Sequence, residues 1–144
     1  MIQIRRQAIV RQTPERMFDL VNDVEAYPRR FAWCAGAAVL AREGEHALTA
    51  RLDLRFAGMT QAFTTHNTFD RPHRLSMRLV DGPLRALDGE WSFVPLGDDG
   101  CRIALALDFD YSGRLAGAAL RLGFQGLANR MVDDFCAAAM RERA

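Results

Sequence analysis

The sequence predicts an α+β fold in which a curved antiparallel sheet wraps around one long C-terminal helix. Between about residues 48 and 111, apolar and polar side chains alternate with a period of two, which is typical of strands with one buried face. In the last thirty residues apolar side chains recur at spacings of three and four, which indicates a single amphipathic helix. A chain of 144 residues is the usual length of one domain, so residues 1–144 are expected to fold together.

The N-terminal segment predicts a strand followed by two short helices. The strand is expected over Gln3–Arg11. Thr13 is a good N-cap, and Pro14 suits the first position of the helix that follows. A second helical turn is expected near Val24–Tyr27, and Pro28 is expected to end it.

The middle of the chain predicts an antiparallel meander. Leu48–Phe56 and Cys101–Tyr111 each place their apolar residues on one face and their charged residues on the other. Turn-forming residues separate the expected strands. They lie at Glu43–Glu45, Gly58, Arg71–Pro72, Asp81–Pro83 and Gly97–Gly100.

The C-terminal segment predicts the long helix. A glycine inside a helix costs about 1 kcal/mol relative to alanine, so Gly117, Gly123 and Gly126 indicate a close approach of backbone or ligand. The apolar stripe that would face the sheet consists of Leu120, Phe124, Leu127, Ala128, Met131 and Phe135.

Composition excludes several functional classes. The net charge is only +1, so no overall field recruits nucleic acid, and no DNA partner is expected. All 19 basic residues are arginine, which excludes a Schiff-base lysine. No apolar run reaches the ~20 residues of a membrane span. The cysteines Cys34, Cys101 and Cys136 lack close spacing and are expected to be reduced thiols in a cytoplasmic protein, with Cys34 a buried thiol or, as the alternative, a nucleophile.

No residues are predicted to be catalytic or to bind a metal. The spacings match no nucleophile–base pair and no glycine-rich phosphate loop, and His46, His66 and His73 are scattered. Asp88 and Glu90 share one face of a predicted strand, where two carboxylates can do acid–base work or can simply be exposed and balanced by arginines on neighbouring strands. Both readings stay open.

The apolar residues of the sheet and the helix stripe predict a binding site for an apolar small molecule. An empty dry cavity of ~300 Å³ would cost roughly 7 kcal/mol, comparable with the total stability of a domain, so such a space is expected to be filled by a long apolar ligand. The predicted ligand-binding residues are Tyr27, Pro28, Phe31, Trp33, Leu54, Phe56, Phe63, Trp91, Phe109, Phe124, Leu127, Met131 and Phe135.

The aromatic loop beside this predicted site is expected to act as a lid. It contains Tyr27, Pro28, Phe31 and Trp33. Nearby arginines either flank a surface that touches a membrane transiently or are simply solvated. These arginines are Arg29, Arg30, Arg114 and Arg121.

Three segments together carry a resemblance to a known family. They are Val21–Pro28 with the following Phe31, Trp33 and Cys34, then Val80–Leu84, and finally Arg130–Phe135. In this order the chain resembles, from about Ile4 to Phe135, the RatA-type, coenzyme-Q-binding branch of the START-like (polyketide cyclase/dehydrase) superfamily. The resemblance implies a helix-grip fold with an apolar cavity between sheet and helix.

The resemblance implies two functions, and the residues that carry it do not distinguish between them. One is binding of ubiquinone or another isoprenoid lipid in support of respiration, which is the first expectation here and implies a cytoplasmic protein with peripheral contact at the inner membrane. The second is that of the RatA-type toxins, which bind the large ribosomal subunit and block its association with the small one. A cyclase- or dehydratase-type enzyme is a distant third, so the protein is expected not to be an enzyme.

Ribosome binding would usually require a basic stripe. Two groups of arginines in the sequence could each begin such a stripe, but acidic residues offset their charge in the total. They consist of Arg5, Arg6 and Arg11, and of Arg71, Arg74 and Arg78.

Overall fold

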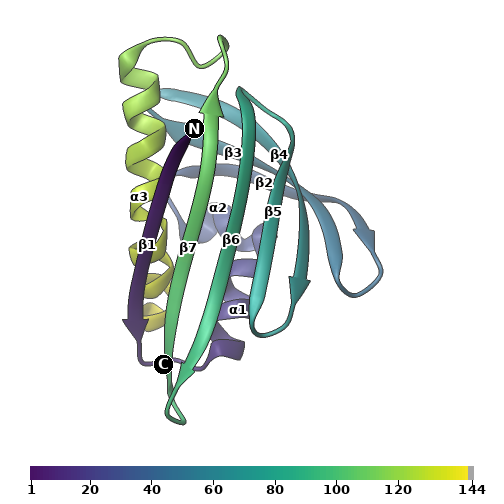
Figure 1. Ribbon diagram of the computed structural model, residues 1–144, viewed down its shortest axis with the longest axis vertical. Coiled ribbons are helices and arrows are strands. Elements are labelled where there is room, and N and C mark those ends of the chain that lie inside the picture. Colours follow the sequence, from purple (N-terminus) through teal and green to yellow (C-terminus); the bar gives the residue numbers. More distant parts are fainter. Residues whose placement is uncertain (143–144) are drawn as a thin grey trace.

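The structure, a computed structural model, describes residues 1–142 and contains a seven-stranded antiparallel sheet and a long C-terminal helix (Figure 1). The predicted α+β helix-grip fold is confirmed. The strands are β1 (Ile2–Val10), β2 (Cys34–Glu43), β3 (Ala47–Phe56), β4 (Met59–Asp70), β5 (Arg74–Asp81), β6 (Leu84–Leu96) and β7 (Gly100–Tyr111). The helices are α1 (Pro14–Asn22), the 3-10 turn η1 (Val24–Ala26), α2 (Tyr27–Arg30) and α3 (Ala118–Arg141).

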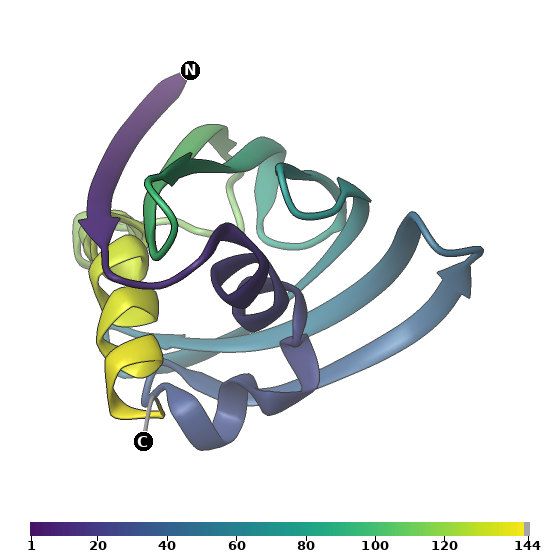
Figure 2. The ribbon, with the colours of Figure 1, turned by 90° about the horizontal axis from the view of Figure 1, so that it is seen from below.

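The strand order places β1 and β2 at opposite edges of the sheet, as β1-β7-β6-β5-β4-β3-β2. The chain returns from the last strand to the first, so that Ile4 pairs with Leu107. Seen end-on in Figure 2, the two halves of the curved sheet lie on opposite sides of α1, and α3 lies at one side of the sheet. Alternation in the strands therefore turns one face of the sheet toward the helices.

The start of α1 follows the prediction, and the start of α2 does not. Thr13 accepts a hydrogen bond through Oγ1 from the backbone N of Arg16 at 3.2 Å, with Pro14 in the first turn. Pro28 was predicted to end a helical turn, but it lies in the first turn of α2. A proline is tolerated there because its missing N–H would have no partner inside the helix.

Helix α3 has the predicted buried stripe, but only one of the three glycines marks a close approach. A Cβ at Gly123 would lie 3.0 Å from Cβ of Ala57, in the turn between β3 and β4. At Gly126 a Cβ would meet nothing within 4 Å. Gly117 precedes the helix as its N-cap, with φ of 95°. Gly123 therefore marks a close approach of α3 to the turn between β3 and β4.

Candidate functional site

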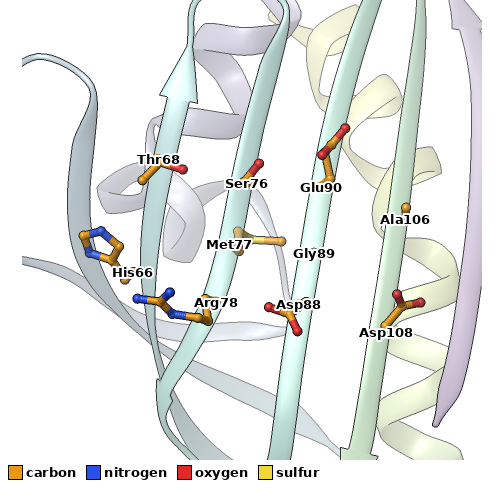
Figure 3. Close-up of a pocket in the computed structure, with 10 residues that line it drawn as sticks. All are labelled: His66, Thr68, Ser76, Met77, Arg78, Asp88, Gly89, Glu90, Ala106 and Asp108. Atoms are coloured by element: carbon orange, nitrogen blue, oxygen red, sulfur yellow. The ribbon is translucent and has the colours of Figure 1, made fainter.

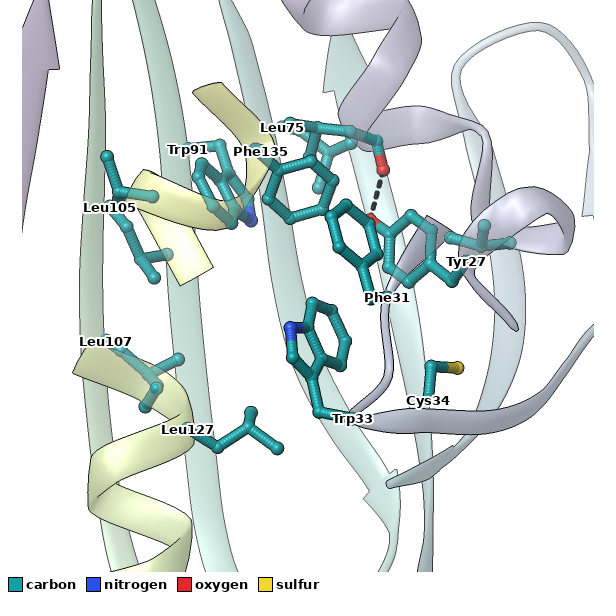
Figure 4. Close-up of a cluster of buried hydrophobic side chains, with 14 of the residues drawn as sticks. Tyr27, Phe31, Trp33, Cys34, Leu75, Trp91, Leu105, Leu107, Leu127 and Phe135 are labelled. Carbon is teal, nitrogen blue, oxygen red and sulfur yellow. Dashed lines mark hydrogen bonds between the residues drawn. The ribbon is translucent and has the colours of Figure 1, made fainter. Parts of the chain in front are cut away.

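The aromatic loop after α2 is packed onto the C-terminal half of α3 (Figure 4). The rings of Phe31 and Trp33 stack at 4.6 Å, and Tyr27 and Trp91 each meet the ring of Phe135 edge-on at 5.3 and 5.2 Å. The Tyr27 hydroxyl donates to the carbonyl of Val21, and burial raises the pKa of Tyr27 well above its usual range. This set of rings, the loop cluster, holds the loop against the helix.

A second aromatic cluster surrounds the N-terminal half of α3. Phe63 stacks on Phe124 at 5.5 Å, and Phe56 and Phe109 meet the same ring edge-on at 5.7 and 5.1 Å. Phe124 and Phe135 are separated by eleven residues, or about 16 Å of helix at 1.5 Å per residue. The two clusters therefore occupy opposite halves of the space between helix and sheet.

The structure brings most of the thirteen predicted ligand-binding residues together between sheet and helix. Met131 is half-buried and Pro28 is exposed. The other eleven are buried, namely Tyr27, Phe31, Trp33, Leu54, Phe56, Phe63, Trp91, Phe109, Phe124, Leu127 and Phe135. They pack against one another, and their role in ligand binding stays a prediction.

Near the second aromatic cluster, part of the inner face of the sheet is less tightly covered. Leu52, Met77 and Leu79 face inward from β3 and β5, yet each is only half-buried. Asn67 is the buried polar side chain on this face, and its Oδ1 accepts a hydrogen bond from Thr65 at 2.8 Å. This part of the inner face is therefore partly accessible and carries one polar pair.

The carboxylates of Asp88 and Glu90 lie on the outer face of the sheet, where they line an open groove of about 510 Å³ (Figure 3). Both are exposed, and Glu90 forms an ion pair with Arg74 at 3.6 Å. Arg78 is the register partner of Asp88 on β5. The sheet thus separates these carboxylates from the aromatic clusters. Arginines on the neighbouring strand balance their charge, as expected for the alternative in which the two carboxylates are simply exposed.

A second hollow, of about 430 Å³, lies beside the loop cluster at the C-terminal half of α3. We call it the arginine hollow. The sequence prediction missed it, although Arg130, Asp134 and Arg141 follow one another on one face of a helix at a spacing that could have revealed it. Its lining consists of Arg30, Phe31, Ala32, Trp33, Arg55, Arg130, Asp134 and Arg141.

The two basic stripes suggested by the sequence are largely neutralised. Four of their six arginines form ion pairs with acidic residues that are distant in the sequence. The pairs are Arg5–Asp108 at 2.8 Å, Arg6–Asp133 at 3.5 Å, Arg71–Asp19 at 2.8 Å and Arg74–Glu90 at 3.6 Å.

The thiols lie in surroundings that keep them protonated. Burial raises the pKa of Cys101 and of Cys136 to about 11. Burial also raises the pKa of Cys34, whose Sγ donates to the carbonyl of Gly36 at 3.2 Å. A thiolate is the reactive form of cysteine, so these environments disfavour nucleophilic chemistry.

Residues 1–142 contain neither a metal-binding cluster nor a membrane-spanning helix. That part of the chain has no group of three or more His, Cys, Asp and Glu side chains placed to hold a metal ion. It also has no helix that is both long and apolar enough to cross a membrane.

Comparison with known proteins gives concordant results. A family model described as polyketide cyclase/dehydrase and lipid transport matches residues 10–136. The ribosome association toxin RatA of Pseudomonas aeruginosa is 41% identical over 133 residues, covering 92% of each chain. The persistence and stress-resistance toxin PasT of Escherichia coli O6:H1 is 40% identical over 135 residues, covering 94% of this chain and 85% of the relative.

Among solved structures, the Zhui aromatase/cyclase of Streptomyces sp. R1128 superimposes with a TM-score of 0.85, covering 99% of this chain and 96% of that one. At 18% identity this likeness concerns the fold alone. The family match, the two relatives and the helix-grip architecture agree. The chain therefore belongs to the polyketide cyclase/dehydrase and lipid transport family of START-like proteins, in the branch that contains the RatA proteins.

Proposed function

We propose that this protein associates with the bacterial ribosome and interferes with the joining of its subunits. The observation that carries the proposal is the 41% identity to a ribosome association toxin over 92% of both chains. A protein acting in this way works in the cytoplasm. It also acts through its surface, which suits a fold whose aromatic residues pack against one another in the interior.

Expression in a bacterial host followed by sucrose-gradient profiles tests this proposal. We expect free subunits to accumulate at the expense of whole ribosomes, with the protein in the fractions of the large subunit. The destabilised variant Phe135→Ala serves as the folding control and is expected to lose the effect, because Phe135 joins the loop cluster to α3. An unchanged profile with abundant folded protein would contradict the proposal.

A second function is favoured by the inner face of the sheet. We infer that an apolar ligand, with ubiquinone or another isoprenoid lipid as the candidate, binds on the half-buried part of this inner face. The half-buried Leu52, Met77 and Leu79 supply apolar surface, and the Asn67 amide supplies a hydrogen-bonding group for a polar head. Sites for small molecules commonly combine such surfaces with a few polar groups.

Gentle purification from a quinone-containing bacterium, followed by solvent extraction and mass spectrometry, tests the ligand. Near-stoichiometric ubiquinone in the extract is the expected result. The variant Leu79→Trp narrows the partly open inner face and is expected to lower the ligand content. An extract without lipid from folded protein would contradict this second function.

A further inference from the structure

The arginine hollow gathers four arginines, and most of their charges are not neutralised by a carboxylate. Of its four arginines, only Arg30 forms ion pairs, with Asp23 at 3.1 Å and Glu142 at 2.9 Å. Within residues 1–142, the guanidinium groups of Arg55, Arg130 and Arg141 form no ion pair with a carboxylate. All three residues are exposed. The hollow therefore brings three arginines without a carboxylate partner together on one surface.

Backbone contacts fix two of these three guanidinium groups at the rim of the hollow. Arg55 donates through Nη1 to the carbonyl of Ala32 at 3.2 Å, and Arg141 donates through Nη2 to the carbonyl of Arg30 at 3.3 Å. A guanidinium has five N–H donors, so each contact leaves several donors for a ligand. Holding the side chain in place also lowers the entropy lost when an anion binds.

The hollow contains one acidic side chain, and that side chain is already engaged. Asp134 accepts a hydrogen bond through Oδ2 from the indole Nε1 of Trp33 at 2.9 Å. The lining therefore has four arginines against one aspartate. Because Asp23 and Glu142 are directed to Arg30, the net attraction for an anion comes from Arg55, Arg130 and Arg141.

We propose that the arginine hollow binds phosphate groups of an RNA backbone and is the contact through which this protein reaches ribosomal RNA. The inference rests on the proposed ribosome association and assigns it to one surface. Arg130 and Arg141 lie eleven residues apart on one face of α3, a span of about 16 Å, which covers several phosphates of a strand. Ala137 lies between them and leaves the middle of this face without a bulky side chain.

The apolar lining of the hollow indicates that the contact is with the backbone rather than with bases or lipid. Phe31 and Trp33 are 4% and 5% exposed, and their faces are stacked on each other. They therefore offer no free ring for base stacking and no exposed apolar wedge for insertion into a bilayer. Arginine pairs bidentately with phosphate oxygens without reading sequence.

The test measures the affinity of the purified protein for purified large ribosomal subunits at several salt concentrations. Each of Arg55→Gln, Arg130→Gln and Arg141→Gln is expected to weaken binding about twofold to fivefold, as for exposed charge pairs. Each is also expected to lower the slope of log K against log salt by about 0.7–0.9. Asp134→Asn removes the one negative charge of the lining and is expected to tighten binding about twofold.

Arg85→Gln and Arg102→Gln are matched controls, because both arginines are exposed on the sheet and lie outside the hollow. They remove the same charge and are expected to leave the affinity and the salt slope unchanged. Equal effects of hollow and control variants, or no effect of either, would overturn the inference while the proposed function stands. No binding of the unsubstituted protein to subunits would instead refute the proposed function itself, and the inference with it.

Two further probes separate the sources of the anion. A single-stranded RNA of about 20 nucleotides is expected to bind at low salt with the same dependence on the three arginines, because phosphate contacts are independent of sequence. Arginine-dependent binding to subunits without binding to this RNA would assign the hollow to an acidic protein. Arginine-dependent binding to vesicles containing phosphatidylglycerol, with no binding to RNA, would assign it to a membrane. Either result would overturn the RNA assignment.

Discussion

The indole of Trp33 and the carboxylate of Asp134 are joined by a hydrogen bond of 2.9 Å across 101 residues of sequence. This bond ties the loop that precedes β2 to the middle of the C-terminal half of α3. It also sets the position of the single carboxylate within the arginine hollow. The same pair thus links the stability of the loop cluster to the electrostatics of the proposed contact surface.

Removing the donor of this bond is expected to destabilise the protein. Trp33→Phe keeps an aromatic ring but leaves the half-buried Asp134 without its indole partner, which costs about 1–3 kcal/mol. Urea unfolding of Trp33→Phe, Asp134→Ala and the double variant measures the coupling. If the two single effects simply add, the hydrogen bond contributes nothing to stability and this expectation is wrong.

The ring of Phe135 is expected to be the largest single contribution of α3 to the core. It is fully buried and meets Tyr27, Phe31, Trp33 and Trp91. Phe135→Ala should lower the free energy of unfolding by about 3–5 kcal/mol. Leu122→Ala on the same helix serves as the control and should change it by less than about 0.5 kcal/mol, since Leu122 is 68% exposed. Similar losses in both variants would contradict this assignment.

Two glycines of α3 are expected to respond oppositely to alanine. Gly126→Ala should raise the free energy of unfolding by about 0.5–1 kcal/mol, because an added Cβ meets nothing within 4 Å and alanine favours the helix. Gly123→Ala should give no such gain, because its Cβ would lie 3.0 Å from Cβ and 3.3 Å from the backbone N of Ala57. Thermal or urea unfolding of both variants checks the pair, and an equal gain would contradict the close approach.

Stability is expected to fall as the pH rises from about 8.5 toward 10. An unfolded cysteine has a pKa of about 8.5, whereas burial raises that of Cys101 and Cys136 to about 11 in the folded protein. In this window the unfolded chain binds fewer protons than the folded one, so raising the pH favours unfolding. Urea unfolding at several pH values should show a shallower decline after substitution of Cys34, Cys101 and Cys136 by alanine. An unchanged decline would contradict the thiol explanation.

The strands and the long helix were predictable because their apolar periodicity is local in the sequence. Leu48–Phe56 and the stripe from Phe124 to Phe135 show the period of their element directly. Pro28 was mispredicted because a proline after a helical turn can either end that turn or stand in the first turn of a new helix, and the local sequence is the same in both cases. Only the surrounding packing of the loop cluster decides between these two roles.

The arginine hollow was not predictable as a whole, because the helical spacing of Arg130 and Arg141 indicates only one of its sides and its charge depends on which arginines lack acidic partners. Arg5 and Arg6 looked like the start of a basic stripe, yet Asp108 and Asp133 reach them from β7 and α3. Arg55 and Arg130 are far apart in the sequence and line the same hollow only after folding. Charge pairing between distant segments leaves no local pattern, whereas apolar periodicity does.

The most direct test of the central claim is subunit joining with purified components. Light scattering follows the association of small and large ribosomal subunits with increasing amounts of this protein, with the triple variant Arg55→Gln, Arg130→Gln and Arg141→Gln in parallel. We expect the unsubstituted protein to reduce the amplitude of association in proportion to its binding to the large subunit, and the triple variant to be weaker. Full association in the presence of excess folded protein would contradict the account.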